Sequence, residues 1–241
     1  LEKPFTGSFD GNKKPISLTL NKDTSDYVAL FPYTIGATVV NVLIDNTSVI
    51  SGKDYVGSVI GKAENSFIGA CTSRATVTGN GKYTGGLIGY GLNSIIDQYK
   101  DSNSGFYGTV IGGPDSQGYI GGFAGALVGS SASAKSRIHY TMRAYCDVIS
   151  NNTSLNANGV GGVVGYCENA EIDGCRRLLL TSILNAENCD CVGLLIGKAN
   201  SNVKITDCIV KGKLRGHDYV GGLVGYFGDN SVINKTNIEV N

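Results

Sequence analysis

Short apolar runs that end in glycine recur along the whole chain. Their common form is an aromatic or aliphatic residue, an aliphatic residue, Gly, a small residue, two aliphatic residues and a final Gly. Six copies occupy residues 55–61, 83–89, 119–125, 160–165, 192–197 and 219–225, and a degenerate copy without the glycines lies at 27–32. Self-similarity of this kind is typical of repeat proteins, in which each unit buries its apolar face only against its neighbours.

Shorter apolar segments lie between the boxes and alternate with polar residues. They occur at 66–68, 94–96, 170–172, 202–205 and 231–233, and a third set includes 74–78 and 208–211. Alternation and β-branched residues predict strands, and only 130–145 leaves room for one short helix. The predicted fold is all-β, a parallel β-helix (β-solenoid) of about seven Gly-rich coils.

The spacing of the boxes predicts one domain over residues 1–241. The first box glycine advances by 28, 36, 40, 32 and 28 residues from Gly57 to Gly221, so 28 residues is the shortest coil. We expect residues 1–20 to form an N-terminal cap and residues 21–241 to form the repeats. The residues beyond 28 in the longer coils predict loop insertions near 101–118 and 130–158.

The box glycines are expected to be structural, because small residues let the chain turn a corner or let backbones approach closely. Gly222→Val is accordingly expected to cost about 1–3 kcal/mol of stability. The predicted structural glycines are Gly57, Gly61, Gly85, Gly86, Gly89, Gly121, Gly122, Gly125, Gly161, Gly162, Gly165, Gly193, Gly197, Gly221, Gly222 and Gly225.

The charge balance narrows the classes of partner. Lys plus Arg and Asp plus Glu both number 20, so no long-range field attracts nucleic acid or an anionic membrane. No apolar run reaches the length of a membrane-spanning helix, and we expect no membrane insertion. Because the chain begins at Leu1 without a signal segment, we expect it to be a mature piece of a longer precursor.

Cysteines and sequons favour a secreted or cell-surface protein. There are seven cysteines, and Asn46, Asn151, Asn152 and Asn234 each begin an Asn-X-Ser/Thr sequon for N-glycosylation. Cys175 and Cys208 fall at near-equivalent places on consecutive coils, which predicts either a disulfide or two small buried thiols. The Cys189-Asp-Cys191 segment predicts a disulfide, with Cys167 as a candidate partner, rather than a zinc site, because neither His139 nor His217 has ligand spacing to it.

The box resembles the repeats of GLUG-motif proteins, named for Gly-Leu-aliphatic-Gly. The unit that starts at Tyr219, Tyr-Val-Gly-Gly-Leu-Val-Gly-Tyr-Phe-Gly-Asp-Asn-Ser-Val-Ile-Asn, carries the likeness most closely, and the opening residues 4–12 resemble the segment that leads into such arrays. The resemblance covers nearly the whole chain and is weakest at 101–118 and 130–158. It implies a surface or adhesion module built as a parallel β-solenoid, without catalytic residues.

No residue pattern indicates an active site, and we expect no catalytic residues, no cofactor and no metal. Asp45, Asp54, Asp173, Asp207 and Asp218 are scattered over repeat positions as turn residues, which disfavours the polysaccharide lyase or hydrolase alternative. The basic stretch 211–217 is expected to be an exposed strand and turn rather than an anion-binding site.

The tyrosines that precede the boxes, Tyr27, Tyr55, Tyr83, Tyr119 and Tyr219, are expected to stack along one corner of the solenoid. The function predicted from the sequence is a structural module of an extracellular fibre, with copies of itself or neighbouring repeats of a longer chain as partners. The alternative is an adhesin module that binds glycans or other proteins.

Overall fold

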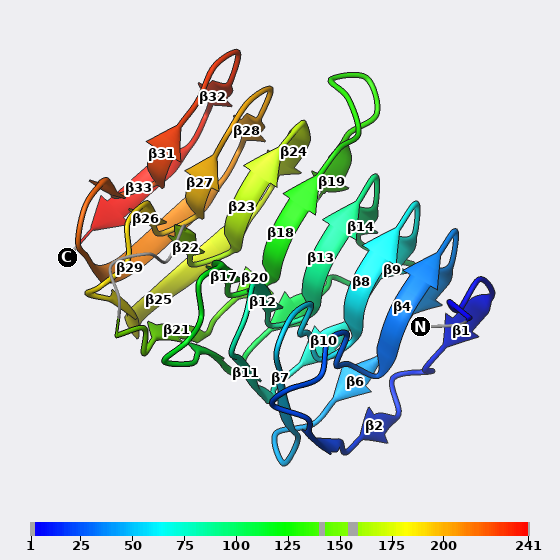
Figure 1. The fold of residues 1–241 in the computed structure, drawn as a ribbon. Coiled ribbons are helices and arrows are strands. Elements are labelled where there is room, and N and C mark those ends of the chain that lie inside the picture. The colour runs from blue at the N-terminus through cyan, green and yellow to red at the C-terminus, as the bar shows by residue number, and fades with distance from the viewer. Residues whose placement is uncertain (1–2, 140–142, 154–158, 241) are drawn as a thin grey trace.

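The chain folds as a parallel β-solenoid of seven turns, as the box spacing predicts (Figure 1). The structure is a computed structural model and describes residues 3–139, 143–153 and 159–240. The strands stack turn upon turn, and the two termini lie at opposite ends of the stack (Figure 1). The described residues contain no helix, and therefore none that could cross a membrane.

Each turn contributes a strand to successive sheets. The seven-stranded sheet contains β4 (Phe31–Ile35), β8 (Ile60–Glu64), β13 (Ile88–Leu92), β18 (Ala124–Val128), β23 (Val164–Glu168), β27 (Ile196–Ala199) and β31 (Val224–Phe227). The eight-stranded sheet contains β1 (Ser8–Asp10), β5 (Thr38–Val40), β9 (Phe67–Gly69), β14 (Ile95–Asp97), β19 (Ser136–Ile138), β24 (Ala170–Asp173), β28 (Lys204–Thr206) and β32 (Val232–Asn234).

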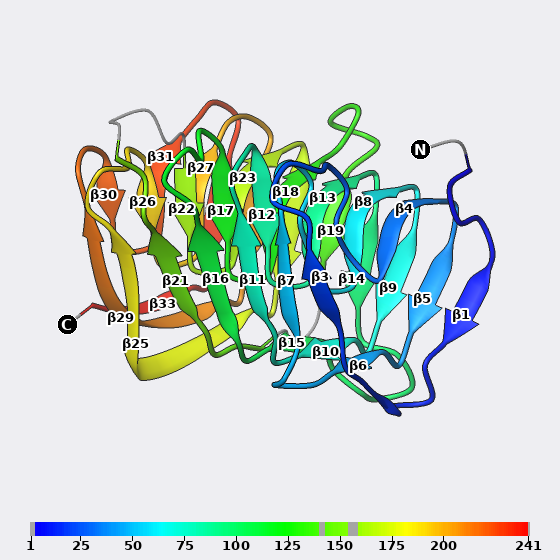
Figure 2. The ribbon, with the colours of Figure 1, turned by 60° about the horizontal axis from the view of Figure 1, so that its bottom comes forward.

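The thirteen-stranded sheet has two arms that merge towards the C-terminus (Figure 2). Its first arm is β2 (Pro15–Ile16), β6 (Leu43–Ile44), β10 (Thr72–Ser73), β15 (Gly105–Phe106) and β20 (Arg143–Ala144). Its second arm is β3 (Thr19–Asn21), β7 (Val49–Gly52), β11 (Thr76–Gly79), β16 (Thr109–Gly112) and β21 (Asp147–Ser150). The long strand β25 (Arg176–Ala186) joins the arms, and β29 (Ile209–Gly216) and β33 (Asn237–Val240) follow it. A five-stranded sheet closes five of the turns with β12 (Tyr83–Gly85), β17 (Tyr119–Gly121), β22 (Gly159–Gly161), β26 (Val192–Gly193) and β30 (Val220–Gly221).

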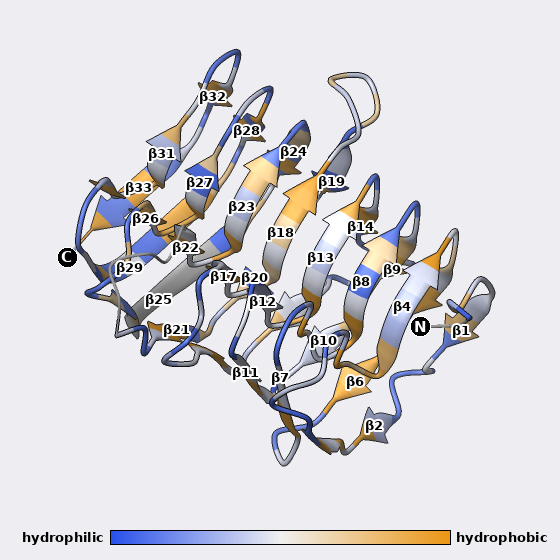
Figure 3. Cartoon of the chain, in the orientation of Figure 1, coloured by the Kyte–Doolittle hydropathy of each residue, from blue (hydrophilic) through white to orange (hydrophobic). Residues whose placement is uncertain are grey.

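The core is a set of apolar columns that run along the solenoid axis. In the eight-stranded sheet, in-register pairing aligns Phe9, Val39, Ile68, Ile96, Ile138, Ile172, Ile205 and Ile233. The six residues between the two ends of this column are fully buried. Apolar stretches occur in every turn from β4 to β31 (Figure 3), so each turn buries its inner face only against the turns beside it.

The box glycines are needed where neighbouring turns approach closely. A Cβ on Gly85 would lie 2.5 Å from the backbone nitrogen of Gly125 on the next turn, and a Cβ on Gly121 would lie 2.7 Å from that of Gly165. Each would also overlap a carbonyl oxygen of its own turn, that of Ile88 or Ala124. Only Gly36 and Gly174 among the described glycines have positive φ, so the box glycines do not serve a left-handed backbone. The left-handed residues of the boxes are instead tyrosines at the first position, such as Tyr55 at 58° and Tyr219 at 50°. At Gly222 a Cβ would meet only side chains of the last strand, Val240 at 2.8 Å and Ile238 at 3.4 Å. Gly222 is therefore the most tolerant of these sites, and the expectation for Gly222→Val moves to the lower end of its range.

A second repeated feature, which the sequence analysis missed, is a left-handed corner that follows six of the seven strands of the seven-stranded sheet, the exception being β18. The positive-φ residues there are Gly36, Asn65, Asn93, Asn169, Asn202 and Asn230. Asparagine and glycine tolerate this conformation better than other residues because their steric cost is lower. The sequence signal for these corners is an asparagine four or five residues after the last box glycine, which is present after five of the six boxes.

Asn65 provides a test of the corner. Asn65→Val should lower the free energy of unfolding by about 1–2 kcal/mol, because Asn65 has a φ of 47° and a branched side chain is strained there. Asn65→Gly should leave the free energy of unfolding nearly unchanged. Urea unfolding followed by circular dichroism measures both. Equal stability of the two variants would contradict the corner's role.

The extra residues of the longer turns are placed at corners. The ranges 101–118 and 130–158, expected as loops, contain β15, β16, β19, β20 and β21, so that expectation was too coarse. Residues 98–104 join β14 to β15, whereas two residues join β9 to β10 in the turn before. The helix considered at 130–145 is absent from the described residues of that segment, which form turns and strands. Corners absorb insertions because an extra residue within a strand would reverse which side chains face the core.

Candidate functional site

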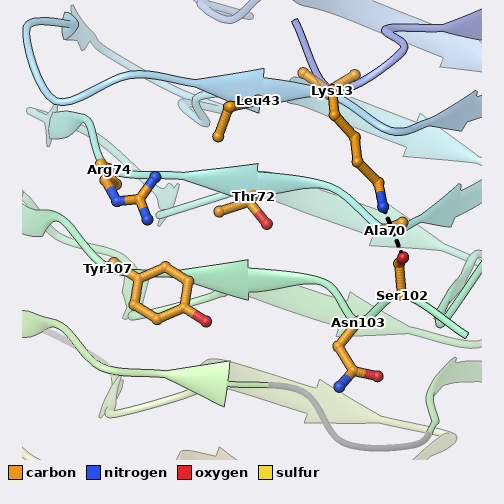
Figure 4. Close-up of a pocket in the computed structure, with 9 residues that line it drawn as sticks. Lys13, Leu43, Ala70, Thr72, Arg74, Ser102, Asn103 and Tyr107 are labelled. Carbon is orange, nitrogen blue, oxygen red and sulfur yellow. Dashed lines mark hydrogen bonds between the residues drawn. The ribbon is translucent and has the colours of Figure 1, made fainter. Parts of the chain in front are cut away.

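An open groove on the outer face of the first arm is the clearest candidate site in the described part of the chain. Its volume is about 340 Å³, within the usual range for ligand pockets. Its floor lies on β6 and β10, and the corner 98–104 forms a wall at one end (Figure 4). The lining residues are Lys13, Val42, Leu43, Ala70, Thr72, Arg74, Ser102, Asn103 and Tyr107.

The wall joins two segments that are distant in sequence. Lys13 Nζ donates a hydrogen bond to Ser102 Oγ at 2.8 Å, which ties the first turn to the inserted corner. The corner folds back on itself through two backbone hydrogen bonds between Tyr99 and Ser102, of 2.9 and 3.1 Å. The insertion thus gives this turn a groove wall that a two-residue corner cannot provide.

At the opposite end of the groove, the Arg74 side chain makes a cation–π contact with Tyr107. The Arg74 guanidinium lies 5.5 Å from the centre of the Tyr107 ring, and Tyr107 packs on Tyr145 at 5.6 Å between ring centres. Asp45 lies beside Arg74 in the strand register but accepts hydrogen bonds from Ser17, Thr47 and Ser48 instead. These bonds, that of Ser17 first, lower the pKa of Asp45 to about 2.

The groove is consequently cationic. In the described residues, no carboxylate lies within 4 Å of the Lys13 amine or of the Arg74 guanidinium, and no acidic residue lines the groove. Both side chains are exposed, so an anion can reach them. Sequence reasoning missed this site because Lys13, Arg74 and Ser102 belong to different turns, and their proximity depends on the strand register.

The predicted tyrosine stack is present along part of the rod. Tyr27, Tyr55, Tyr83 and Tyr119 follow one another with ring-centre distances of 4.7, 5.2 and 6.0 Å. The strand register places Gly159 and then Cys191 next in this column, so no tyrosine follows Tyr119 there. Tyr166, from a neighbouring strand, packs on the Tyr119 ring at 4.6 Å between ring centres. Tyr219 contacts Tyr226, at 6.3 Å, at the far end. Because these rings cover one another, the stack is a packing element rather than an open platform for sugars.

All seven cysteines are buried free thiols in the structure. The Cys175 and Cys208 side chains are hydrogen-bonded neighbours, so the structure brings together the predicted pair, and this contact, with burial, raises the pKa of Cys175. Cys189 donates to Ser150 Oγ at 3.0 Å. The disulfides Cys175–Cys208 and Cys167 with Cys189 or Cys191 stay predictions, which non-reducing peptide mapping of the natural protein would check.

The Cys71 thiol should be nearly inert in the folded protein. Burial raises the pKa of Cys71 from 9.0 to about 12, which lowers its thiolate fraction at pH 8 by about a thousandfold. Iodoacetamide should therefore label Cys71 rapidly in urea and very slowly in buffer, as read by peptide mass spectrometry. Comparable labelling rates in the two solutions would show that this thiol reaches solvent.

His217 lies on the turn next to the Cys189–Cys191 segment, and its backbone N–H donates to the Cys189 carbonyl at 2.9 Å. His217 Nδ1 lies 3.2 Å from Asp190 Oδ1 and 3.5 Å from Asp218 Oδ2, so its partners are carboxylates rather than thiols. Two further cations of the basic stretch are also paired: Lys211 contacts Glu239 at 2.6 Å and Arg215 contacts Glu187 at 3.0 Å. This stretch is thus an exposed strand with cross-turn ion pairs.

Asp45 and Asp54 are turn residues, as expected. Asp45 Oδ1 accepts the backbone N–H of Thr47 at 3.0 Å, and Asp54 Oδ1 accepts that of Lys82 on the next turn at 2.7 Å. Both carboxylates stabilise the backbone where they lie.

The four sequons differ in accessibility. Asn46, Asn151 and Asn234 are exposed. Asn152 is only 2% exposed, and its Nδ2, the atom that a glycan would modify, donates to the Ser116 carbonyl at 2.6 Å. The structure therefore disfavours Asn152 as an acceptor in the folded protein, because the side chain would have to leave a buried hydrogen bond.

Comparisons with known proteins give one partial similarity. A segment of 100 residues is 41% identical to Halomucin of Haloquadratum walsbyi (strain DSM 16790 / HBSQ001). The similarity covers 40% of this chain and 1% of the length of Halomucin. No family model matches the chain, and no solved structure matches it significantly. The resemblance to GLUG-motif proteins accordingly stays a prediction.

Proposed function

We propose that this chain is a non-catalytic structural module of an extracellular or cell-surface fibre, and that its copies stack end to end. The observation that carries the proposal is the match between the two ends of the solenoid. Each end of the described stack presents strands that lack a neighbour on their outer side, with apolar side chains beside them. Open strand edges of this kind recruit further strands.

The C-terminal end carries the larger apolar surface. Val220, Ile233 and Ile238 are 46%, 41% and 42% exposed, whereas their partners on the preceding turn, Val192, Ile205 and Val210, are fully buried. A further turn stacked at this end would bury Val220, Ile233 and Ile238, as the last turn of the chain buries their partners. Burial of apolar surface is the main favourable term in such association.

The first turn of a second copy fits this end column by column. The apolar columns that end in Phe227, Ile233, Leu214 and Val220 begin in Phe5, Phe9, Leu20 and Val28. Ile16 in β2 and Ile238 in β33 occupy the outermost places on the two ends of the thirteen-stranded sheet. Continuing the columns from one copy into the next is a head-to-tail contact, which repeats in one direction to form a filament.

The remaining features agree with a surface location. Three sequons are exposed. The partial similarity to Halomucin is compatible with a structural module of the cell surface. Light scattering of the purified chain tests the proposal, because its mass should rise with concentration in steps of one chain. Negative-stain images should show rods that lengthen by about 34 Å per copy, seven turns at about 4.8 Å each. A constant monomeric mass at high concentration would overturn the proposal.

A further inference from the structure

The groove between Lys13 and Arg74 has the charge and the lining of a ligand site, and the end-to-end contact does not use it. We propose that it binds an acidic saccharide, a short run of sugars that carry carboxylate or sulfate groups. Charge is the first argument. The two cations face a groove that no acidic residue lines, whereas Lys211, Arg215 and His217 of the basic stretch 211–217 are paired with carboxylates of neighbouring turns.

The placement of the two cations selects an extended ligand. The Lys13 amine lies beside Ser102 and Ala70, and Arg74 lies at the opposite end of β10 (Figure 4). Ala70 and Arg74 are separated by a backbone span of at most about 13 Å, at about 3.3 Å per residue. The two cationic groups thus lie at opposite ends of the groove with Thr72 between them, so a single small anion is not placed to contact both (Figure 4). A chain of linked units with an anionic group near each end can.

The lining between the cations suits sugars. Thr72, Ser102 and Tyr107 present hydroxyl groups and Asn103 presents an amide, while Leu43 and Ala70 provide an apolar floor. Sugars combine hydroxyl groups with apolar C–H faces and match such a mixed surface. Gly105, which pairs with Thr72, has no side chain, and the Tyr107 ring lies over it, 2.7 Å from where a Cβ would stand.

A peptide ligand fits less well. Peptides that bind to sheets usually add a strand to a free edge. In the first arm, β10 is paired with β6 on one side and β15 on the other, so the floor of the groove offers no free edge. A ligand here must bind through side chains, and the charges at the two ends determine which ligands do so.

Calorimetric titration of the full chain tests the proposal. The probes are an oligogalacturonate of defined length, a heparin-derived oligosaccharide, a neutral maltooligosaccharide of equal length and inorganic phosphate. We expect at least one acidic oligosaccharide to bind, with an affinity that falls as the salt concentration rises, and the neutral one to show no binding. Comparing the first two probes distinguishes carboxylate from sulfate recognition.

The variants Arg74→Ala and Lys13→Ala should each weaken binding at least tenfold without changing the thermal unfolding temperature, because both side chains are exposed. Lys22→Ala is the matched control, an exposed lysine outside the groove, and should bind as the unmodified chain does. The proposal fails if neither acidic oligosaccharide binds, if phosphate binds as tightly as the oligosaccharide, or if the two groove variants bind as the control does.

Discussion

Gly85→Ala is expected to lower the free energy of unfolding by about 3 kcal/mol or more. The added Cβ would meet only backbone atoms: the Ile88 carbonyl oxygen at 2.1 Å, the Gly125 nitrogen at 2.5 Å and the Ala124 Cα at 2.7 Å. Backbone cannot rotate away as a side chain can, so two neighbouring turns must separate. The loss should be evident in urea unfolding followed by far-ultraviolet circular dichroism.

Gly7→Ala is the matched control for this substitution. A Cβ on Gly7 would meet only the Phe5 ring, at an ordinary contact distance of 3.4 Å, and Gly7 is exposed. Its stability should change by less than about 1 kcal/mol. If Gly85→Ala were as mild as Gly7→Ala, the box glycines would not be needed for close approach of the turns.

Ile238→Lys is expected to weaken end-to-end association at least about 30-fold, equivalent to about 2 kcal/mol. Ile238 lies in the last strand, β33, and is 42% exposed, whereas Val210 beside it is fully buried. A lysine there would place a charge in the column that the proposed contact buries, and an unpaired buried charge is strongly unfavourable. Sedimentation equilibrium measures the change in the association constant.

Val49→Lys is its control. Val49 is also 42% exposed, but it lies on β7, which is paired on both sides, with β3 and with β11. The same change of charge there should leave association unaltered. Equal weakening by both variants would indicate a general effect of charge rather than a contact at the end of the solenoid.

The sequence predicted the features that repeat in every turn. The spacing from Gly57 to Gly221 was sufficient for the all-β solenoid and for the tyrosine column from Tyr27 to Tyr119, because stacked turns place equivalent residues side by side. The same spacing correctly predicted that Cys175 and Cys208 lie side by side. Periodicity transfers directly from sequence to structure in a solenoid.

Features that depend on a single turn could not be predicted in this way. The groove requires the corner 98–104 to meet Lys13, a contact between residues 89 positions apart, and no repeat unit contains both. The burial of Asn152 depends on its hydrogen bond to Ser116, which follows from the path of one long corner. The tolerance of Gly222 likewise follows from its place in the last turn, where fewer atoms surround it.

Cross-linking between copies tests the central claim most directly. Phe9 and Ile233 occupy the two ends of one column, so Phe9→Cys with Ile233→Cys should place two thiols on adjacent strands of stacked copies, within the Cα separation of about 4.4–6.8 Å that a disulfide needs. Mild oxidation should then give a ladder of covalent multimers on a non-reducing gel. Phe9→Cys with Val49→Cys should give no ladder, since Val49 lies on β7, which is paired on both sides. Absence of the ladder from the first variant, or equal ladders from both, would contradict head-to-tail stacking of the solenoid.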